Sequence, residues 1–344
     1  MFFFYKIILM SSSINMADEN SSNDTDLSSS DDDSIPNNIR FWILLFLDIP
    51  AVSCTIFLLY HLLLKRQLRQ ALHNHIVILI LINILMCQLF DMPFYIVFYH
   101  LGYVWWQAPA FCLFWWLMDT GPLSFCTILL AYGSFERHIL IFHSNLVSTR
   151  RKRWIFHYIP LCCVLIYCFV FYSYAIFFAP CQNTFDYDQS VCSYPCYFDD
   201  PVLGPYDTIG NGFVVAILNI IADIGLIVRH MRHRHRMQQN IQWRKYRKML
   251  IQLLSMSALV FVFTLPVLFG LGIEQCGVTS EILHRILGYA YFFNYFIILL
   301  LPYPCFIAFP ELRRTLYGRI RNVLRLQHIN TVTAVAVLHK QQVQ

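Results

Sequence analysis

Seven long apolar runs constrain the fold of this chain more than any other feature of its sequence. The hydrocarbon core of a bilayer is about 30 Å thick, so a helix needs roughly 20 apolar residues to cross it. The strands of a membrane barrel are about ten residues long and alternate in polarity, so runs of this length and continuity favour helices. We therefore expect an all-α membrane protein with a seven-transmembrane helix bundle. The runs cover residues 41–64, 76–99, 111–135, 154–178, 209–228, 249–273 and 286–308.

The composition excludes an ordinary soluble domain. Of the 344 residues, 58% are hydrophobic and 13% are charged, whereas soluble domains average about 45–50% and about 25%. A soluble fold would expose the surplus apolar surface to water, while a bilayer solvates that surface. We therefore assign residues 41–308 to one transmembrane domain.

The connections that join these runs alternate between segments rich in Lys and Arg and segments poor in both. The first, third and fifth connections and the tail are basic, whereas the second and fourth connections contain neither Lys nor Arg. Short loops rich in these residues stay in the cytoplasm during insertion. The alternation predicts a multi-pass plasma membrane protein with an extracellular amino terminus. The basic residues are Lys65, Arg66 and Arg69, then Arg150, Arg151, Lys152 and Arg153, then the run from Arg229 to Lys248, and finally Arg313, Arg314, Arg319, Arg321, Arg325 and Lys340.

The segment before the first run is rich in Ser, Asn and Asp. Such a segment buries too little apolar area to offset its ordering entropy, so residues 1–40 are predicted to be a disordered extracellular tail. Asn20 and Asn23 each begin a glycosylation sequon, which suits that side of the membrane. The first ten residues are too short to span, and we favour an extension upstream of a start at Met16 over a signal peptide.

The segment after the seventh run repeats apolar residues at every fourth position beside arginines. Leu312, Leu316, Ile320 and Leu324 carry this pattern. A basic amphipathic helix lies in the membrane interface and is attracted to anionic lipid of the inner leaflet. Residues 309–326 are therefore predicted to form a short amphipathic eighth helix, followed by a cytoplasmic tail over residues 327–344.

Five of the 12 cysteines fall on the predicted outer side, which is an oxidising compartment. A disulfide bond between the start of the third run and the long fourth connection is expected there, although four cysteines allow three connectivities. We predict Cys112–Cys196 with Cys181–Cys192, and keep Cys192 as the alternative partner of Cys112. Cys276 is left free or paired elsewhere. The sequence contains no closely spaced Cys and His pattern of a metal site, and no cofactor is expected.

The inner end of the third run carries Glu136, Arg137 and His138, with Arg137 standing 25 positions after Cys112. In this spacing the chain resembles the rhodopsin-like (class A) G-protein-coupled receptors, as a divergent orphan member. That family has Asp or Glu, Arg and Tyr here. The resemblance implies that these three residues and the basic loop from Arg229 to Lys248 form the contact surface for a heterotrimeric G protein. It also implies that Glu136 holds Arg137 in the resting state, because a buried Arg is costly without a partner.

Two further family motifs are present only in part. Residues 263–266 keep the proline of the sixth-helix motif, and residues 301–305 keep the first proline of the seventh-helix motif. Pro266 and Pro302 each remove an intrahelical hydrogen bond, so they provide candidate hinges for a two-state switch. Tyr246 stands where many relatives have an acid that locks the sixth helix, and its presence predicts elevated basal activity. Asn83 replaces the acid of the family's sodium pocket.

Three acids, Asp48, Asp91 and Asp119, fall in the outer halves of their helices. Ionisable residues within a span usually face a cavity or a partner, so the acids favour a cationic ligand. Asp119 lies 18 positions before Arg137, where amine receptors of this family bind the ligand's ammonium group, and Tyr295 stands where they have a Tyr that bonds this Asp. The predicted ligand-binding residues are Asp119, Tyr295, Asp91 and Tyr291.

The rest of an amine site is missing, so the ligand class stays open. Val267 and Leu268 stand where amine receptors build an aromatic cage, and such a cage contributes about 0.5–2 kcal/mol to ammonium binding. An amine and a basic peptide therefore fit equally well. Four tryptophans near the outer boundary are expected to form an interfacial belt. They are Trp105, Trp106, Trp115 and Trp116.

The favoured function is a receptor that converts binding of an extracellular small-molecule or peptide ligand into G-protein activation. The alternative is a seven-helix chemoreceptor channel or a transporter. Transporters usually show related halves and broken, Gly-rich helices, which this sequence does not have. A membrane-embedded enzyme would need a His-rich or paired acidic motif at cytoplasmic depth, so no enzymatic activity is predicted. Loop basicity alone does not support nucleic-acid binding.

Overall fold

The computed structural model describes residues 35–142, 148–236, 241–278, 280–309, 312–314, 318 and 321. Within these residues, seven helical segments are long and apolar enough to cross a membrane. They are Asn37–Leu64, Asn74–Leu101, Pro109–Leu140, Arg150–Phe177, Leu203–Arg229, Leu250–Glu274 and Glu281–Ala308. Each contains or closely overlaps one predicted run, so the seven-helix prediction is confirmed. The spans extend beyond some runs because polar residues such as Arg150 continue a helix past its apolar part.

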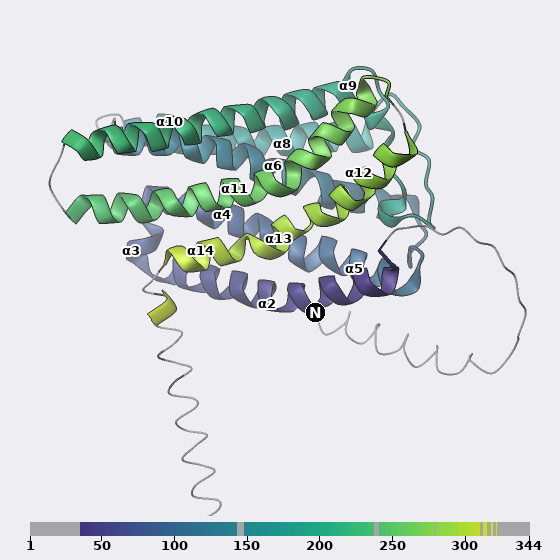
Figure 1. Cartoon of the computed structure of the whole chain (residues 1–344), viewed down its shortest axis with the longest axis horizontal. Helices are drawn as coiled ribbons and strands as arrows, with labels where there is room; N and C mark the ends of the chain where they lie inside the picture. The colour runs from purple at the N-terminus through teal and green to yellow at the C-terminus, as the bar shows by residue number, and fades with distance from the viewer. Residues whose placement is uncertain are drawn as a thin grey trace, which may run out of the picture.

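The spans are built from the following elements (Figure 1). The first is α2 (Asn37–Leu64), and the short α3 (Arg66–Arg69) follows it. The second comprises α4 (Leu72–Met86), η1 (Cys87–Asp91) and α5 (Met92–Leu101), and the third is α6 (Pro109–Phe142). The fourth comprises α7 (Arg150–Arg153), η3 (Trp154–Tyr158) and α8 (Ile159–Phe177), and the fifth comprises α9 (Leu203–Pro205), η6 (Tyr206–Val214) and α10 (Val215–Arg236). The sixth lies in α11 (Ile241–Gln275), and the seventh comprises α12 (Glu281–Asn294), α13 (Phe296–Leu300) and α14 (Pro302–Ala308).

Several predictions concern residues outside this set. The sequons at Asn20 and Asn23 and the tail 327–344 lie outside the described residues. Of the predicted amphipathic helix 309–326, residues 309, 312–314, 318 and 321 are described; Phe309 is not helical, and the other five are.

The elements η1, η3 and η6 are π-helical segments inside longer helices. A π-helical turn inserts one residue into the helix and rotates the face that follows, and such turns are frequent at functional sites. Each of the three contains a buried ionisable side chain, namely Asp91, His157 and Asp207. At Asp91 and His157 the irregular turns therefore coincide with polar positions that interrupt apolar runs, whereas Asp207 lies just before the fifth run.

Helix α6 runs through the middle of the bundle and packs against α4, α8, α10 and α11 (Figure 1). At its outer end, the expectation of an interfacial tryptophan belt is wrong for two of the four residues. Trp115 and Trp116 are 0% and 1% exposed, whereas Trp106 is 56% exposed. Both buried indoles donate hydrogen bonds inside the protein, which is the usual condition for burying Trp.

The predicted pairing of Cys112 with Cys196 is wrong, because the structure joins Cys112 to Cys192 and Cys181 to Cys196. Trp116 lies one turn beyond Cys112, and its indole Nε1 donates to Val191 O at 2.5 Å and to Ser193 O at 3.2 Å. These bonds bring the turn that contains Cys192 onto α6. The loop itself aligns the second pair, Cys181–Cys196, because the backbone N–H of Cys196 donates a hydrogen bond to Asn183 Oδ1.

The two predicted hinge prolines differ in their surroundings. Pro266 lies inside the continuous helix α11, which changes direction between its two halves (Figure 1). Pro302 is the first residue of α14, directly after a break at Leu301. Proline is well tolerated at a first helical position because its missing N–H would have no partner there.

Candidate functional site

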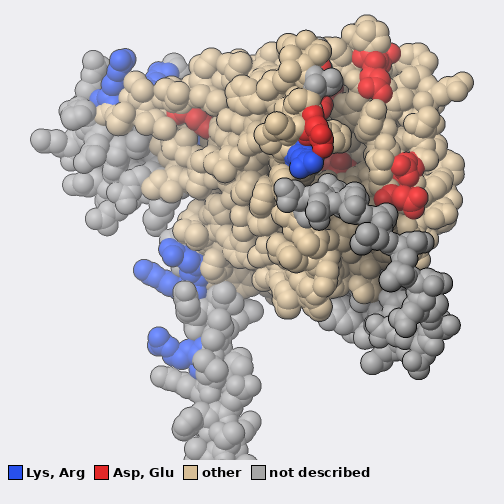
Figure 2. Space-filling model, turned by 45° about the vertical axis from the view of Figure 1, so that its right-hand side comes forward, with Lys and Arg blue, Asp and Glu red and all other residues tan. Residues whose placement is uncertain are grey.

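A cavity of about 170 Å³ lies between α6, η6 with α10, α11 and α12. Of the predicted ligand-binding residues, Asp119, Tyr291 and Tyr295 line it. The loop between α8 and α9 covers this end of the bundle and contributes Phe198 to the wall. Acidic side chains are frequent on this end, whereas most of the Lys and Arg side chains in view lie toward the opposite end (Figure 2). The cavity is therefore on the side that the sequence assigns to the exterior.

Asp119 and Tyr295 are connected through a residue that the sequence did not single out. Tyr95 donates its hydroxyl to Asp119 Oδ1 at 3.1 Å, and the Tyr295 hydroxyl donates in turn to the Tyr95 hydroxyl. The centroids of the two tyrosine rings are 4.3 Å apart. This chain of hydroxyls fixes the orientation of the Asp119 carboxylate at the cavity wall.

Asp91, the remaining predicted ligand residue, does not line the cavity. It is 0% exposed, and its Oδ1 accepts a hydrogen bond from Trp115 Nε1 at 3.0 Å. The structure thus separates two acids that the sequence grouped together, with Asp119 on the cavity wall and Asp91 in the packed interior.

Asp207 also lines the cavity, and the sequence analysis did not identify it. Its Oδ1 accepts from Tyr172 OH at 2.7 Å and from Asn211 Nδ2 at 2.9 Å, while its Oδ2 accepts from Tyr197 OH at 3.0 Å. Burial and the nearby Asp207 carboxylate raise the pKa of Tyr197 well above its usual value, so Tyr197 remains a hydrogen-bond donor. Asp207 therefore ties the outer loop to α8 and η6.

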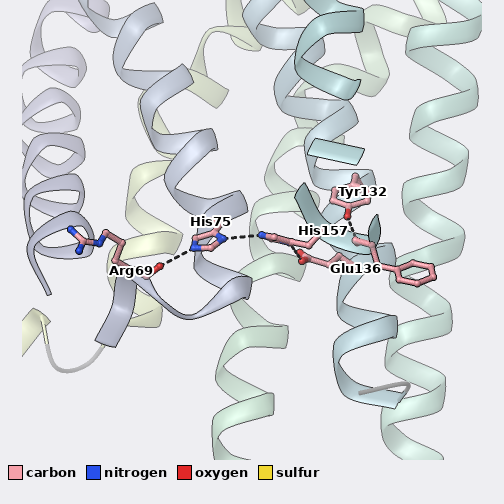
Figure 3. A network of polar contacts seen from close by, with 6 residues as sticks. Arg69, His75, Tyr132, Glu136 and His157 are labelled. Atoms are coloured by element: carbon pink, nitrogen blue, oxygen red, sulfur yellow. Dashed lines mark hydrogen bonds and ion pairs between the residues drawn. The ribbon is translucent and has the colours of Figure 1, made fainter. Parts of the chain in front are cut away.

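The inner end of the bundle contains a relay of polar side chains, two of which are fully buried (Figure 3). Glu136 Oε1 contacts His157 Nδ1, and these two side chains are 2% and 0% exposed. His157 Nε2 lies 2.8 Å from His75 Nδ1, and His75 Nε2 lies 2.8 Å from Arg69 O. The relay joins the third, fourth and second spans to the first inner connection.

Counting donors gives the charge of this relay. With Glu136 ionised, its carboxylate and the Arg69 carbonyl are both acceptors, and the contact between the two rings needs one further N–H. Three N–H groups are required, but two neutral imidazoles provide only two. The relay therefore holds one proton more than two neutral imidazoles supply, and this proton makes Glu136, His157 and His75 neutral as a group.

Arg137 and His138 follow Glu136 on α6. Arg137 is 0% exposed, and its guanidinium is attracted electrostatically to Asp223 on α10 as well as to Glu136. Ser134 donates to Asp223 Oδ1 at 2.5 Å, which fixes that carboxylate near α6. His138 Nε2 lies 3.3 Å from the carbonyl oxygen of Ala222. The third and fifth spans are thus joined around the predicted switch residues.

Sequence reasoning missed Asp207, His157 and Asp223 as site residues, although a signal was present. His157 and Asp223 interrupt apolar runs, and a polar side chain inside a span usually has a partner there. Asp207 was missed because it falls at the boundary between a loop and a helix, where an acid is unremarkable.

Seven apolar helices, with a covered cavity at one end of the bundle and a buried polar centre at the other, define a polytopic membrane protein. Comparison with protein-family models agrees, since residues 55–306 match the 7 transmembrane receptor (rhodopsin family) model. The match covers most of the chain, which therefore belongs to the rhodopsin family of G-protein-coupled receptors. A search among curated proteins finds no match.

Proposed function

We propose that this receptor resides in the plasma membrane with its amino terminus outside and binds a cationic extracellular ligand in the outer cavity. The observation that carries the proposal is Asp119, a carboxylate oriented by hydroxyl groups on the wall of that cavity. Among the described residues that line the cavity there is no Lys or Arg. An ammonium or guanidinium group would supply the missing positive charge and form a charge-assisted hydrogen bond with Asp119.

Ligand binding would be transmitted to a heterotrimeric G protein through the inner ends of the helices. Val260 and Leu268 on α11 line the cavity, and Pro266 lies between them in the same helix. A ligand that favours one bend of α11 shifts a pre-existing equilibrium between two arrangements of its inner half. Arg137 would become accessible in the second arrangement, as the family resemblance implies.

The charge distribution supports the proposed orientation. The short α3 and α7, which belong to the first and third connections, are basic. The cytoplasmic leaflet carries anionic lipid, which attracts such residues at a membrane surface. The membership in the rhodopsin family favours a receptor over a channel or a transporter.

The test uses cells that express the chain and a panel of biogenic amines and amidated peptides. We expect at least one cationic compound to stimulate second-messenger signalling, and basal signalling to exceed that of cells with an empty vector because Tyr246 replaces the usual acid. Arg137→Ala should abolish both signals at equal surface expression, and Asp119→Ala should abolish stimulation. Signalling that does not depend on Arg137 would contradict the transduction proposal, and ligand binding unchanged by Asp119→Ala would remove this residue from the site.

A further inference from the structure

Two carboxylates from different helices line the same cavity. Asp119 comes from α6 and Asp207 from η6, and each is oriented by its own set of tyrosine hydroxyls. The described lining residues supply no Lys or Arg against either acid. A single ammonium group bound at Asp119 would therefore leave a second carboxylate on the cavity wall without a countercharge. Leaving a charge without a partner away from bulk water is costly.

The hydrogen bonds around Asp207 leave room for a ligand. An ionised carboxylate accepts at about four positions, and Asp207 accepts three hydrogen bonds, two at Oδ1 and one at Oδ2. One position at Oδ2 therefore remains for a further donor. Asp207 is 8% exposed and lines the cavity, so a small ligand can reach it.

The wall also contains apolar side chains. Leu123 on α6, Val215 on α10 and Leu268 on α11 all line the cavity. A volume of about 170 Å³ suits a small, slender molecule. The site thus combines two anionic groups with aliphatic surface.

We propose that the ligand of this receptor is an aliphatic dication, with one cationic group bound at Asp119 and the other at Asp207. The spacer between the two groups packs against the aliphatic part of the wall. This inference rests on the proposed function, because it takes the cavity as the ligand site, and it narrows the ligand class from any cation to a diamine or a related molecule.

Binding is measured on the purified receptor in lipid nanodiscs, as the rise in thermal unfolding temperature on adding ligand. This measurement needs no G protein, since any molecule that binds only the folded state raises its stability. The probes are linear terminal diamines from propanediamine to octanediamine, with the linear monoamine of each chain length as the control. We expect diamine affinity to peak at one chain length, and the diamine of that length to bind about 10–100-fold more tightly than its monoamine, as expected for a hydrogen bond to a charged group.

Asp207→Asn tests the second subsite because it removes the charge and keeps the shape of the side chain. This variant should bind the optimal diamine about 10–100-fold more weakly and bind the monoamine as the wild type does. Asp199→Asn is the matched control, since Asp199 is an exposed acid of the neighbouring loop. Tyr172→Phe removes a donor from Asp207 but keeps the carboxylate, so it should preserve the preference for the diamine.

The outcomes separate this inference from the proposed function. Diamines that bind no more tightly than monoamines, or an Asp207→Asn variant that weakens both ligands equally, would overturn the dication and leave a purely structural role for Asp207. The proposed function would survive either result if monoamines still bind through Asp119 and signal through Arg137. Diamine binding without Arg137-dependent signalling would support the dication site and contradict the transduction proposal instead.

Discussion

Replacing His157 by Phe should destabilise the receptor strongly, because it leaves Glu136 Oε1 buried without its hydrogen-bond partner. The phenyl ring keeps the volume of the imidazole but has no N–H group. Both side chains are almost fully excluded from solvent, at 0% and 2% exposure. Breaking a buried pair by removing one partner costs about 3–5 kcal/mol, since the remaining group loses the contact that offset its desolvation.

The expected shift in unfolding temperature follows from that cost. A change of 1 kcal/mol shifts the midpoint by about 2–4 °C in a domain of about 150–250 residues, so His157→Phe should lower it by about 6–20 °C. The measurement is the thermal unfolding of purified receptor in nanodiscs at a fixed heating rate, because unfolding of such proteins is often irreversible.

A double-mutant cycle isolates the electrostatic part of this effect. Glu136→Gln removes the buried charge, so the double variant His157→Phe with Glu136→Gln should regain at least half of the lost stability. His75→Phe is a matched control at the imidazole farther from Glu136. It should lower the stability less, because His75 is half-buried and does not contact Glu136 directly. If the effects of the two single changes add, Glu136 and His157 are not energetically coupled and the relay does not stabilise the fold through this contact.

Three further predictions follow from the outer half of the bundle. Peptide mapping of the non-reduced protein should recover Cys112 linked to Cys192, and replacing either one by Ser should lower stability by about 2–5 kcal/mol, the usual cost of losing a native disulfide bond. Tyr95→Phe should weaken binding of a cationic ligand about 3–10-fold in the nanodisc assay, because it removes the hydroxyl that orients Asp119 and a typical hydrogen bond is worth about 0.5–1.5 kcal/mol. Pro266→Ala should leave ligand affinity nearly unchanged but reduce maximal stimulated signalling, since it restores a helical hydrogen bond at the proposed hinge; full signalling would remove Pro266 from the switch.

The sequence predicted the fold well because the physics that determines it is local. A run such as 41–64 must be helical in lipid whatever its neighbours are, since its backbone hydrogen bonds have no other partners there. The helix ends were less accurate, as at Leu203, where polar residues continue the fifth span beyond its apolar part. The motif around Arg137 pointed to the rhodopsin family, and the family-model match over residues 55–306 shows the same family.

The contacts between helices could not be predicted, because they depend on the rotation of each helix and on the path of the loops. Cys192 was ranked below Cys196 as the partner of Cys112, and the deciding contact is a hydrogen bond from Trp116 to the loop. The π-helical turn that ends at Asp91 similarly alters which residues face the interior. Sequence spacing assumes a regular helix and therefore placed this acid beside the cavity.

The most direct test of the proposed receptor mechanism is the affinity of the purified chain for its ligand with and without a heterotrimeric G protein. Coupling between two binding sites is reciprocal, so a G protein that prefers the active arrangement must raise the affinity for an activating ligand by the same factor. For the most stabilising amine of the panel, we predict a rise of about 5–150-fold in nanodiscs, lost in the Arg137→Ala variant. Equal affinities with and without G protein would contradict the account.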